Sequence, residues 1–515
     1  MLPLEASTND PAAAKPGDGH EDKLRQTRAE RRLVRKVDLV LMPVLLFSVG
    51  LQYLDKASVA AVLGSAAIFG IIKDLGLSTT HVDPNTGRTV TSTLRYSTAS
   101  SAFYWGYIVA VLPFALALQR LPLSKALSLC IFLWGLTALL TIVCTSYEGL
   151  VVQRVFLGVL ESSISPGFVM ITSQWYKKSE QAARLGIWYS ATGIFSAFSG
   201  VVFYGLGSAD GSFAPWKRMY CFAGGLTILL SLVVLLVIPD SPRTSGRWFS
   251  DDERQILIRR ARENMSGRTE LSAFDWRQAR EAVVDLKIWV FMLMVTAFSS
   301  QIVKSFGYDS LTTIAISIPG GVFTAVFIYF FTYLSHKWKN GLTYLIPISC
   351  LPVMVGAAII WGADWSRRGV PLFGNYLLAT FGSPYVLLLA LSTANVAGAT
   401  KKSIAAGAIF VGYCTGKYTV FIDERSVKYR STWIALFVSL GVVSILSLFL
   451  RYLLARENRL RETRAAAGSG ADKAIDEKAD EHEDGDSMSA EEREQERVER
   501  EDLTDFENTR FRYTL

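Results

Sequence analysis

The chain has 515 residues, of which 50% are hydrophobic and only 19% are charged, and its mean hydropathy is +0.28. This composition excludes an ordinary soluble domain, because the apolar runs reach the length of about 20 residues that crosses a bilayer. The net charge of +7 does not indicate a nucleic-acid binder, since the basic residues flank the apolar runs and orient a membrane protein. We therefore expect a polytopic protein of the lipid bilayer with no nucleic-acid partner.

The cysteine and histidine residues predict no metal site. All five cysteines fall within or at the ends of apolar runs, without a CxxC spacing, and are expected to be reduced packing residues. The histidines lie in predicted loops and tails, and the chain has no phosphate-binding loop and no nucleophile elbow. We expect neither an enzyme nor a bound cofactor. The five cysteines are Cys130, Cys144, Cys221, Cys350 and Cys414.

The first half of the chain is predicted to hold six membrane spans. Residues 1–36 form a polar, disordered N-terminus that ends in a basic, cytoplasmic collar, and residues 37–239 hold the spans. Residues 73–98 are expected to be a long polar loop. The predicted spans are 38–61, 99–118, 126–145, 149–172, 185–207 and 218–238.

The first span carries polar side chains on one helical face. Ser48, Gln52, Asp55 and Lys56 are spaced at i, i+4, i+7 and i+8. A charged side chain inside a bilayer costs a few kcal/mol, so this face is a candidate functional site.

The fourth span carries a second pair of charges. Arg154 and Glu161 are two helical turns apart, so they project from one face about 10 Å apart along the axis. Gly158 lies between them and leaves room for a close approach. An ion pair that only locks two helices together is the alternative. The second pair of charges, Asp55 and Lys56 in the same half, favours a functional site.

The centre of the chain is charged. Residues 240–287 are predicted to be a cytoplasmic loop, and Ser250 followed by Glu253 is typical of a capping box that begins a surface helix.

The second half, residues 288–454, is predicted to hold six further spans. A charged cytoplasmic tail at 455–515 follows, and it is expected to be disordered or marginally helical. An even number of spans places both termini on one side, and the basic clusters at 25–36 and 451–464 favour the cytosol. Arg367, Arg368 and the cluster 425–430 fall outside in this arrangement and count against it. The seventh span has only about 16 apolar residues, about 24 Å of helix. The spans are 288–304, 311–334, 342–362, 371–394, 403–421 and 432–453.

Several motifs, in their order and spacing, resemble the fungal anion:cation symporter family of the major facilitator superfamily, in its allantoate permease branch. The resemblance covers the chain from about residue 30 onward. Its motifs are Leu54-Asp55-Lys56, Phe103-Tyr104-Trp105-Gly106-Tyr107, Gln119-Arg120-Leu121-Pro122, Arg154…Gly158…Glu161…Pro166-Gly167, Gln174-Trp175-Tyr176-Lys177-Lys178, Pro239-Asp240-Ser241-Pro242, Asn395-Val396-Ala397-Gly398-Ala399-Thr400-Lys401-Lys402 and Asn508…Phe511-Arg512-Tyr513.

The resemblance implies an all-α fold of twelve transmembrane helices in two six-helix halves. It also implies a monomeric secondary transporter in the fungal plasma membrane that takes up small organic anions, usually carboxylates, with protons. Matched position by position, Asp55 and Glu161 would handle the proton, and Lys56 and Arg154 would bind the substrate carboxylate.

Three further residues are candidates for substrate contact: Gln52 on the polar face of the first span, and Tyr104 and Tyr107 at the start of the second. The aromatic run around Tyr104 fits a cavity lining and helix packing equally well.

The residue types suit this chemistry independently of the family resemblance. A carboxylate that enters a low-dielectric cavity needs a fixed cation, and arginine offers a planar fork while lysine offers a point charge. If each carboxylate competes with the substrate for its neighbouring cation, substrate binding would release the carboxylate for protonation. Two other classes stay open, a proton-driven exporter of drugs or metabolites and a nutrient sensor that does not transport.

Overall fold

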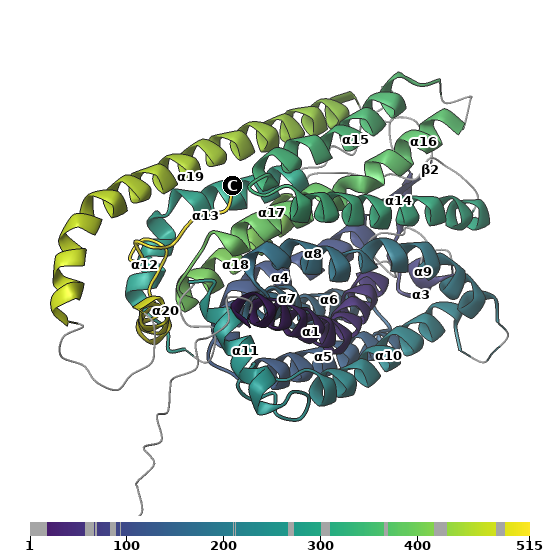
Figure 1. Ribbon diagram of the computed structural model, residues 1–515. Coiled ribbons are helices and arrows are strands. Elements are labelled where there is room, and N and C mark those ends of the chain that lie inside the picture. Colours follow the sequence, from purple (N-terminus) through teal and green to yellow (C-terminus); the bar gives the residue numbers. More distant parts are fainter. Residues whose placement is uncertain are drawn as a thin grey trace, which may run out of the picture.

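The computed structural model describes most of the chain. The described residues are 18–56, 66, 69–82, 89–92, 94–209, 211, 213–265, 272–299, 310–364, 369–416, 430–479 and 490–515. Figure 1 shows long helices that run side by side as one bundle.

Six spans form the first half, and two of them consist of two consecutive helices. The fourth span is α6 followed by α7, and the fifth is α8 followed by α9. The helices are α1 (Asp18–Lys56), α4 (Leu94–Leu118), α5 (Leu123–Leu139) with η2 (Leu140–Val143), α6 (Tyr147–Glu161), α7 (Ile164–Trp175), α8 (Lys178–Tyr189), α9 (Ala191–Ser208) and α10 (Pro215–Val237).

The second half is also built from membrane spans, and the tenth span of the protein is interrupted at η3. The helices are α13 (Leu286–Ser299), α14 (Ser310–Lys337), α15 (Leu342–Gly362), α16 (Gly369–Leu378), η3 (Ala379–Phe381), α17 (Gly382–Ala394), α18 (Ala399–Gly416) and α19 (Arg430–Ala479).

The prediction of an all-α polytopic membrane protein is confirmed. Ten stretches of the described chain are long and apolar enough to cross a bilayer, and α13 and α18 stand where the seventh and eleventh spans are predicted. The apolar part of α13, Leu286–Ala297, is short, as the sequence indicates. The ends of the first, seventh and eleventh predicted spans lie outside the described residues.

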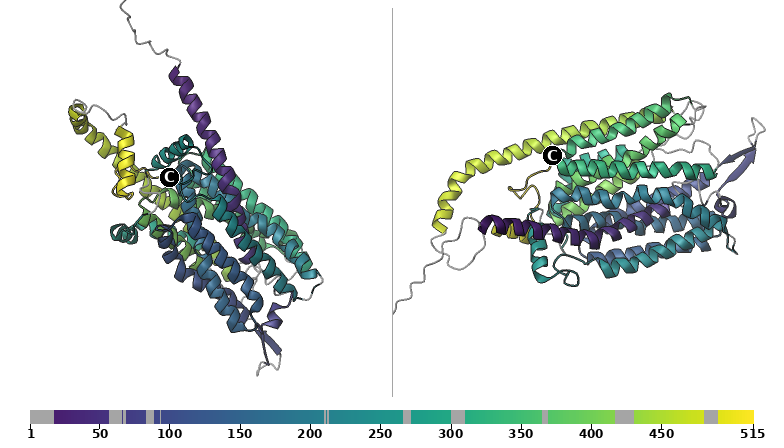
Figure 2. Two further views of the ribbon diagram at one scale, coloured as in Figure 1. Left: turned by 90° about the horizontal axis from the view of Figure 1, so that it is seen from below. Right: turned by 45° about the vertical axis from the view of Figure 1, so that its right-hand side comes forward.

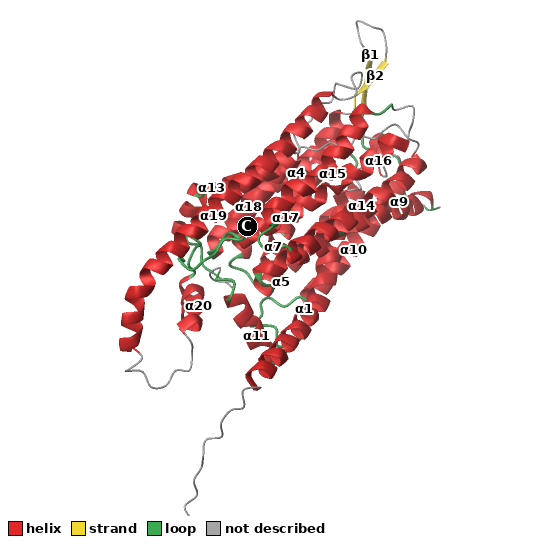
Figure 3. Cartoon of the chain, turned by 45° about the horizontal axis from the view of Figure 1, so that its top comes forward, coloured by secondary structure: helices red, strands yellow, loops and turns green. Residues whose placement is uncertain are grey.

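The predicted polar loop at 73–98 is partly structured. A short helix, α3 (Ile71–Asp74), precedes an antiparallel hairpin of β1 (Thr79–Val82) and β2 (Thr89–Ser92), in which Thr79 faces Ser92. Both strands are rich in threonine and valine, which favour paired strands, but the hairpin was not predicted from the sequence. Figure 3 places the hairpin at one end of the bundle and α11 and α20 at the other; we name these the hairpin end and the α11 end.

The central block contains two surface helices, α11 (Asp251–Arg262) and α12 (Trp276–Val284). The predicted capping box is confirmed, since Ser250 accepts from the Glu253 amide and Glu253 accepts from the Ser250 amide. Arg260 joins α11 to the bundle through salt bridges to Glu30 of α1, at 3.1 Å, and Glu180 of α8, at 2.8 Å.

The basic collar is helical, which corrects the prediction of a disordered segment over 1–36. Helix α1 begins at Asp18, and Leu33 and Val37 are buried against the bundle. Their burial, together with the ion pair of Glu30, stabilises the helix beyond the span itself. Residues 1–17 lie outside the described part of the chain.

Two glycines bring α4 and α6 into backbone contact. A methyl group on Gly158 would collide with the carbonyl oxygen of Phe103, and one on Gly106 would collide with that of Val155. Helix α4 therefore makes the close approach that the sequence predicts at Gly158.

The described part of the C-terminal tail is ordered, so the helical one of the two predicted states is found, together with a buried segment that the sequence did not predict. It contains α20 (Ala490–Glu501) and a terminal segment, 502–515, in which Phe511 and Asp505 are fully buried. Arg461 of α19 holds this segment by donating to the carbonyl oxygens of Asp505, at 2.8 Å, and Phe511, at 3.0 Å. The low apolar content of the tail predicts disorder, but its few apolar groups bind a surface that the rest of the chain supplies. In Figure 2 the chain end lies against the bundle.

Asp505 is the centre of a buried ion network at the α11 end. Its carboxylate contacts the ammonium groups of Lys287, at 2.9 Å, and Lys401, at 2.8 Å. Burial alone would raise the pKa of Asp505, but the two ammonium groups outweigh it and hold the pKa at about 2. Lys401 also contacts Glu281 at 2.6 Å and Asp285 at 2.8 Å. The network therefore joins the terminal segment to α12, α13 and α18.

Candidate functional site

Arg154 is a buried cation within the first half. Its side chain, on α6, is only 3% exposed, and its guanidinium donates a hydrogen bond of 2.5 Å to the hydroxyl of Tyr220 on α10. The ring of Tyr220 lies 5.7 Å from the guanidinium carbon. The Nε of Arg154 has no hydrogen-bond partner among the described residues, and no described carboxylate forms a salt bridge with it. Its charge is thus available to an anion.

Asp55 lies near the end of α1 and is buried. Its carboxylate accepts a hydrogen bond of 2.8 Å from the indole nitrogen of Trp134 on α5. Gln52, one turn earlier on the same face, is also buried, and its amide nitrogen has no partner in the described part of the chain. The backbone of Lys56 ends α1, and its side chain lies outside the described residues.

Glu161 is the last residue of α6, at the break before α7, and its side chain is fully buried. Tyr107 of α4 lies close to Glu161 and to Ser165 of α7. A helix break at mid-membrane depth is tolerated where the backbone lines a cavity or is enclosed by protein. The structure thus brings Glu161 and Tyr107 together, whereas Arg154 lies two turns away against Tyr220.

The aromatic run on α4 divides between two environments. Tyr107 is buried, and Tyr104 is half-buried, with its ring edge-on to Phe103 at 5.2 Å between centroids. Tyr107 approaches Glu161, while Tyr104 packs against Phe103 and the core of the bundle.

A group of tyrosines that was not predicted from the sequence spans the two halves. Tyr189 of α8 lies 5.1 Å from Tyr385 of α17, and Tyr385 lies 5.7 Å from Tyr413 of α18, between ring centroids. Tyr53 of α1 lies near Tyr413 and donates to Ser196 of α9 at 3.2 Å. Tyrosines offer an apolar face and a hydroxyl, so this group can contact a small polar molecule from both halves.

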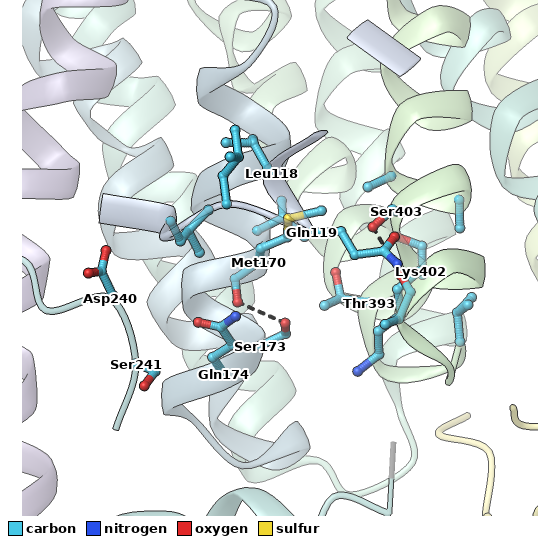
Figure 4. Close-up of a pocket in the computed structure, with 18 of the residues that line it drawn as sticks. Leu118, Gln119, Met170, Ser173, Gln174, Asp240, Ser241, Thr393, Lys402 and Ser403 are labelled. Carbon is cyan, nitrogen blue, oxygen red and sulfur yellow. Dashed lines mark hydrogen bonds between the residues drawn. The ribbon is translucent and has the colours of Figure 1, made fainter. Parts of the chain in front are cut away.

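A cavity of about 440 Å³ opens between the halves at the α11 end. We name it the vestibule. Figure 4 shows Gln119, Ser173 and Gln174 of the first half across from Thr393, Lys402 and Ser403 of the second. Most of the remaining lining is aliphatic, contributed by α4, α7, α17 and α18. Lys402 belongs to one of the motifs of the family resemblance, but no role was predicted for it from the sequence.

The described residues of the first half include the buried cation Arg154, the buried carboxylates Asp55 and Glu161, and the helix break between α6 and α7. Fixed charges of both signs in a protein interior can bind an anion and exchange a proton, as long as they are accessible in turn from the two sides.

Comparisons with known proteins agree with this arrangement. The family model of the Major Facilitator Superfamily matches residues 45–419. An uncharacterised transporter of Schizosaccharomyces pombe is 31% identical over 94% of this chain and 90% of its own length. The allantoate permease of Saccharomyces cerevisiae is 29% identical over 94% of this chain and 87% of its own length. Among solved structures, the proton:xylose symporter XylE matches 81% of this chain and 95% of its own with a TM-score of 0.56, at 13% identity, which supports the fold alone.

Proposed function

The chain belongs to the major facilitator superfamily, and from this premise we propose that it is a proton-coupled importer of a small organic anion. Its relatives at 29–31% identity include fungal transporters, among them the allantoate permease. The protein is an integral membrane protein. We place the α11 end in the cytosol of a fungal cell and the hairpin end outside the plasma membrane, because the basic collar and the basic stretch 451–464 both lie at the α11 end.

The observation that carries the proposal is the buried guanidinium of Arg154. A buried charge is stable only when it is paired or hydrogen-bonded, and Arg154 has one neutral hydroxyl partner among the described residues. A substrate carboxylate can supply the missing countercharge with a bidentate pair. In this account Tyr220 holds the guanidinium in place while the site is empty.

Asp55 and Glu161 supply the proton coupling in this proposal. Both are buried carboxylates in the same half as Arg154, and Glu161 lies at the break of the fourth span. A proton that neutralises Glu161 would reduce the repulsion between this carboxylate and an incoming anion. Anion and proton would then enter together, and the rocking of the two halves would release both to the cytosol.

We propose a carboxylate that also carries N–H groups as the substrate class. The name of the allantoate permease describes transport of a ureido acid by that relative. The hydroxyls of the tyrosine group between the halves can accept from N–H groups, and the unpaired Nε2 of Gln52 can donate to an oxygen of such a molecule.

Uptake of labelled allantoate into yeast cells that lack their own permease tests the proposal. We expect uptake that rises as the external pH falls and that is lost in Arg154→Ala. The matched control is Arg280→Ala, because Arg280 is exposed on α12 and should leave uptake unchanged. A panel of other carboxylates, offered as sole nitrogen or sulfur source, covers the case in which allantoate is not the substrate.

The same assay separates the alternatives. An exporter would lower the cell content of the anion when the outside is acidic, and a sensor would bind the anion in detergent without any flux in vesicles. Either result would contradict the importer.

A further inference from the structure

Lys401 and Lys402 are neighbours in the sequence but have opposite surroundings. The ammonium group of Lys401 contacts three carboxylates, those of Glu281, Asp285 and Asp505. Lys402 forms no salt bridge and donates no side-chain hydrogen bond within the described residues, and its side chain lines the vestibule. Lys401 is thus neutralised by carboxylates, one of which belongs to the C-terminal segment, whereas Lys402 leaves a cation at the cavity wall (Figure 4).

The vestibule also contains two acceptors that lack donors. Gln119 donates through Nε2 to the carbonyl oxygen of Ala273, at 3.0 Å, and to the hydroxyl of Thr400, at 2.9 Å. These bonds fix the orientation of its amide, and they leave Oε1 buried without a partner in the described chain. The Oε1 of Gln174 is likewise buried and has no partner there. A buried acceptor without a donor is costly, so both oxygens favour a ligand that donates hydrogen bonds.

The acidic groups near the vestibule are already engaged. Asp240, at the opposite wall, accepts from the backbone amide of Ser124 at 3.0 Å and lies 3.9 Å from the ammonium group of Lys125. The carboxylates that interact electrostatically with Lys402 are those of Asp502 and Asp505. Asp502 accepts from the backbone amide of Ala399 at 3.1 Å, and Asp505 is held in the ion network.

We propose that the vestibule is a second binding site, distinct from the Arg154 site, for a small carboxylate that carries N–H donors. The carboxylate binds Lys402, the N–H groups donate to Gln119 and Gln174, and the carbon skeleton lies against the aliphatic lining. A cavity with mostly apolar walls and a few convergent polar groups is the usual form of a small-molecule site. The oxygen of an amide binds N–H groups and repels a carboxylate, so the two ends of the ligand are oriented.

The site takes its groups from both halves. Gln119, directly after α4, and Gln174 of α7 belong to the first half, and Lys402 of α18 belongs to the second. A ligand here therefore contacts both halves at the α11 end. The interpretation that a transported anion occupies this site during its passage to the cytosol rests on the proposed function. The proposal that the site binds such an anion does not.

Binding to the purified full-length protein in detergent, measured by isothermal titration, tests the site. The probes are ureidoacetate and levulinate, which share size and carboxylate, but levulinate replaces the N–H groups by carbon. All variants carry Arg154→Ala, which removes the other proposed anion site. We expect ureidoacetate to bind this background, and levulinate to bind at least about fivefold more weakly, because the two acceptors stay unpaired.

Three further variants locate the binding. Lys402→Met should weaken ureidoacetate binding at least about tenfold, and Lys402→Arg should restore most of it. Gln174→Leu should reduce the preference for ureidoacetate over levulinate. Lys339→Met is the matched control, because Lys339 is an exposed lysine between α14 and α15 and its removal should change nothing.

Two results would overturn the inference. One is the loss of all binding in Arg154→Ala itself. The other is equal binding by the Lys402→Met and Lys339→Met proteins. If the protein transports no anion but Lys402-dependent binding persists, the proposed function fails and the second site stands. If transport occurs without any Lys402-dependent binding, the reverse holds.

Discussion

Arg154 donates its 2.5 Å hydrogen bond to Tyr220 across two helices, α6 and α10, that are far apart in the sequence. This hydroxyl is the only hydrogen-bond acceptor that the described chain offers the guanidinium, so it fixes the direction in which the fork points. The relationship makes Tyr220 a positioning residue for a group that, in our proposal, binds the substrate.

The first prediction follows from this bond. Tyr220→Phe keeps the ring beside Arg154 but removes the hydroxyl, and a hydrogen bond of this kind contributes about 1 kcal/mol. We expect the KM for anion uptake to rise about threefold to tenfold while the maximal rate changes little. Tyr147→Phe, whose ring lies on Arg95, is the control and should keep the original KM. An unchanged KM in Tyr220→Phe would remove Tyr220 from the site.

The second prediction concerns the contact of α4 with α6. Gly158→Ala places a methyl group against the carbonyl oxygen of Phe103, where no flexible side chain can move aside. Overpacking typically costs about 1–3 kcal/mol, so we expect a lower Tm in detergent and less protein in the membrane. Gly225→Ala is the matched control, since Gly225 of α10 has nothing within 4 Å of the added carbon. Equal Tm values for the two variants would contradict the close packing.

The third prediction is a pH dependence of stability. The pKa of Asp505 falls on folding from 3.8 to about 2, because Lys287 and Lys401 favour its ionised form over the effect of burial. A depressed pKa contributes stability above about pH 4, here about 2 kcal/mol, and this contribution is lost as the pH falls towards 2. Asp505→Asn should therefore have a lower Tm than the natural protein at pH 6, and the difference should shrink below pH 4.

The control for this pH series is Asp252→Asn, because Asp252 is exposed on α11. Its Tm should follow that of the natural protein at every pH. A difference between Asp505→Asn and the natural protein that stays constant from pH 6 to pH 3 would contradict the ion network.

The spans could be predicted from the sequence because long apolar runs bounded by charges have few alternatives in a bilayer. The predicted span 342–362 coincides with α15, and Ser250 and Glu253 begin α11 as their capping pattern indicates. Arg154, Asp55 and Glu161 were identifiable for the same reason, since a charge within an apolar run is rare and costly. Their partners, Tyr220 and Trp134, depend on which helices pack together and have no signal in the local sequence.

The C-terminal segment shows where local composition misleads. Asp505 and Phe511 lie in a stretch whose charged, apolar-poor character predicts disorder, but their partners Lys287, Lys401 and Arg461 are 44 or more residues away. The difference between Lys401 and Lys402 also arises from distant partners, because the two lysines are adjacent in the same helix turn. Only the folded arrangement decides which of them meets carboxylates and which meets a cavity.

The most direct test of proton-coupled anion import is accumulation of labelled allantoate, or of the carboxylate found in the growth panel, in proteoliposomes with an imposed pH gradient. The natural protein and Glu148→Gln, which alters an exposed glutamate at the start of α6, should concentrate the anion on the alkaline side. Glu161→Gln should lose this accumulation while it still exchanges labelled for unlabelled anion, because a permanently neutral side chain carries no proton cycle. Accumulation by Glu161→Gln to the level of the natural protein would contradict the account.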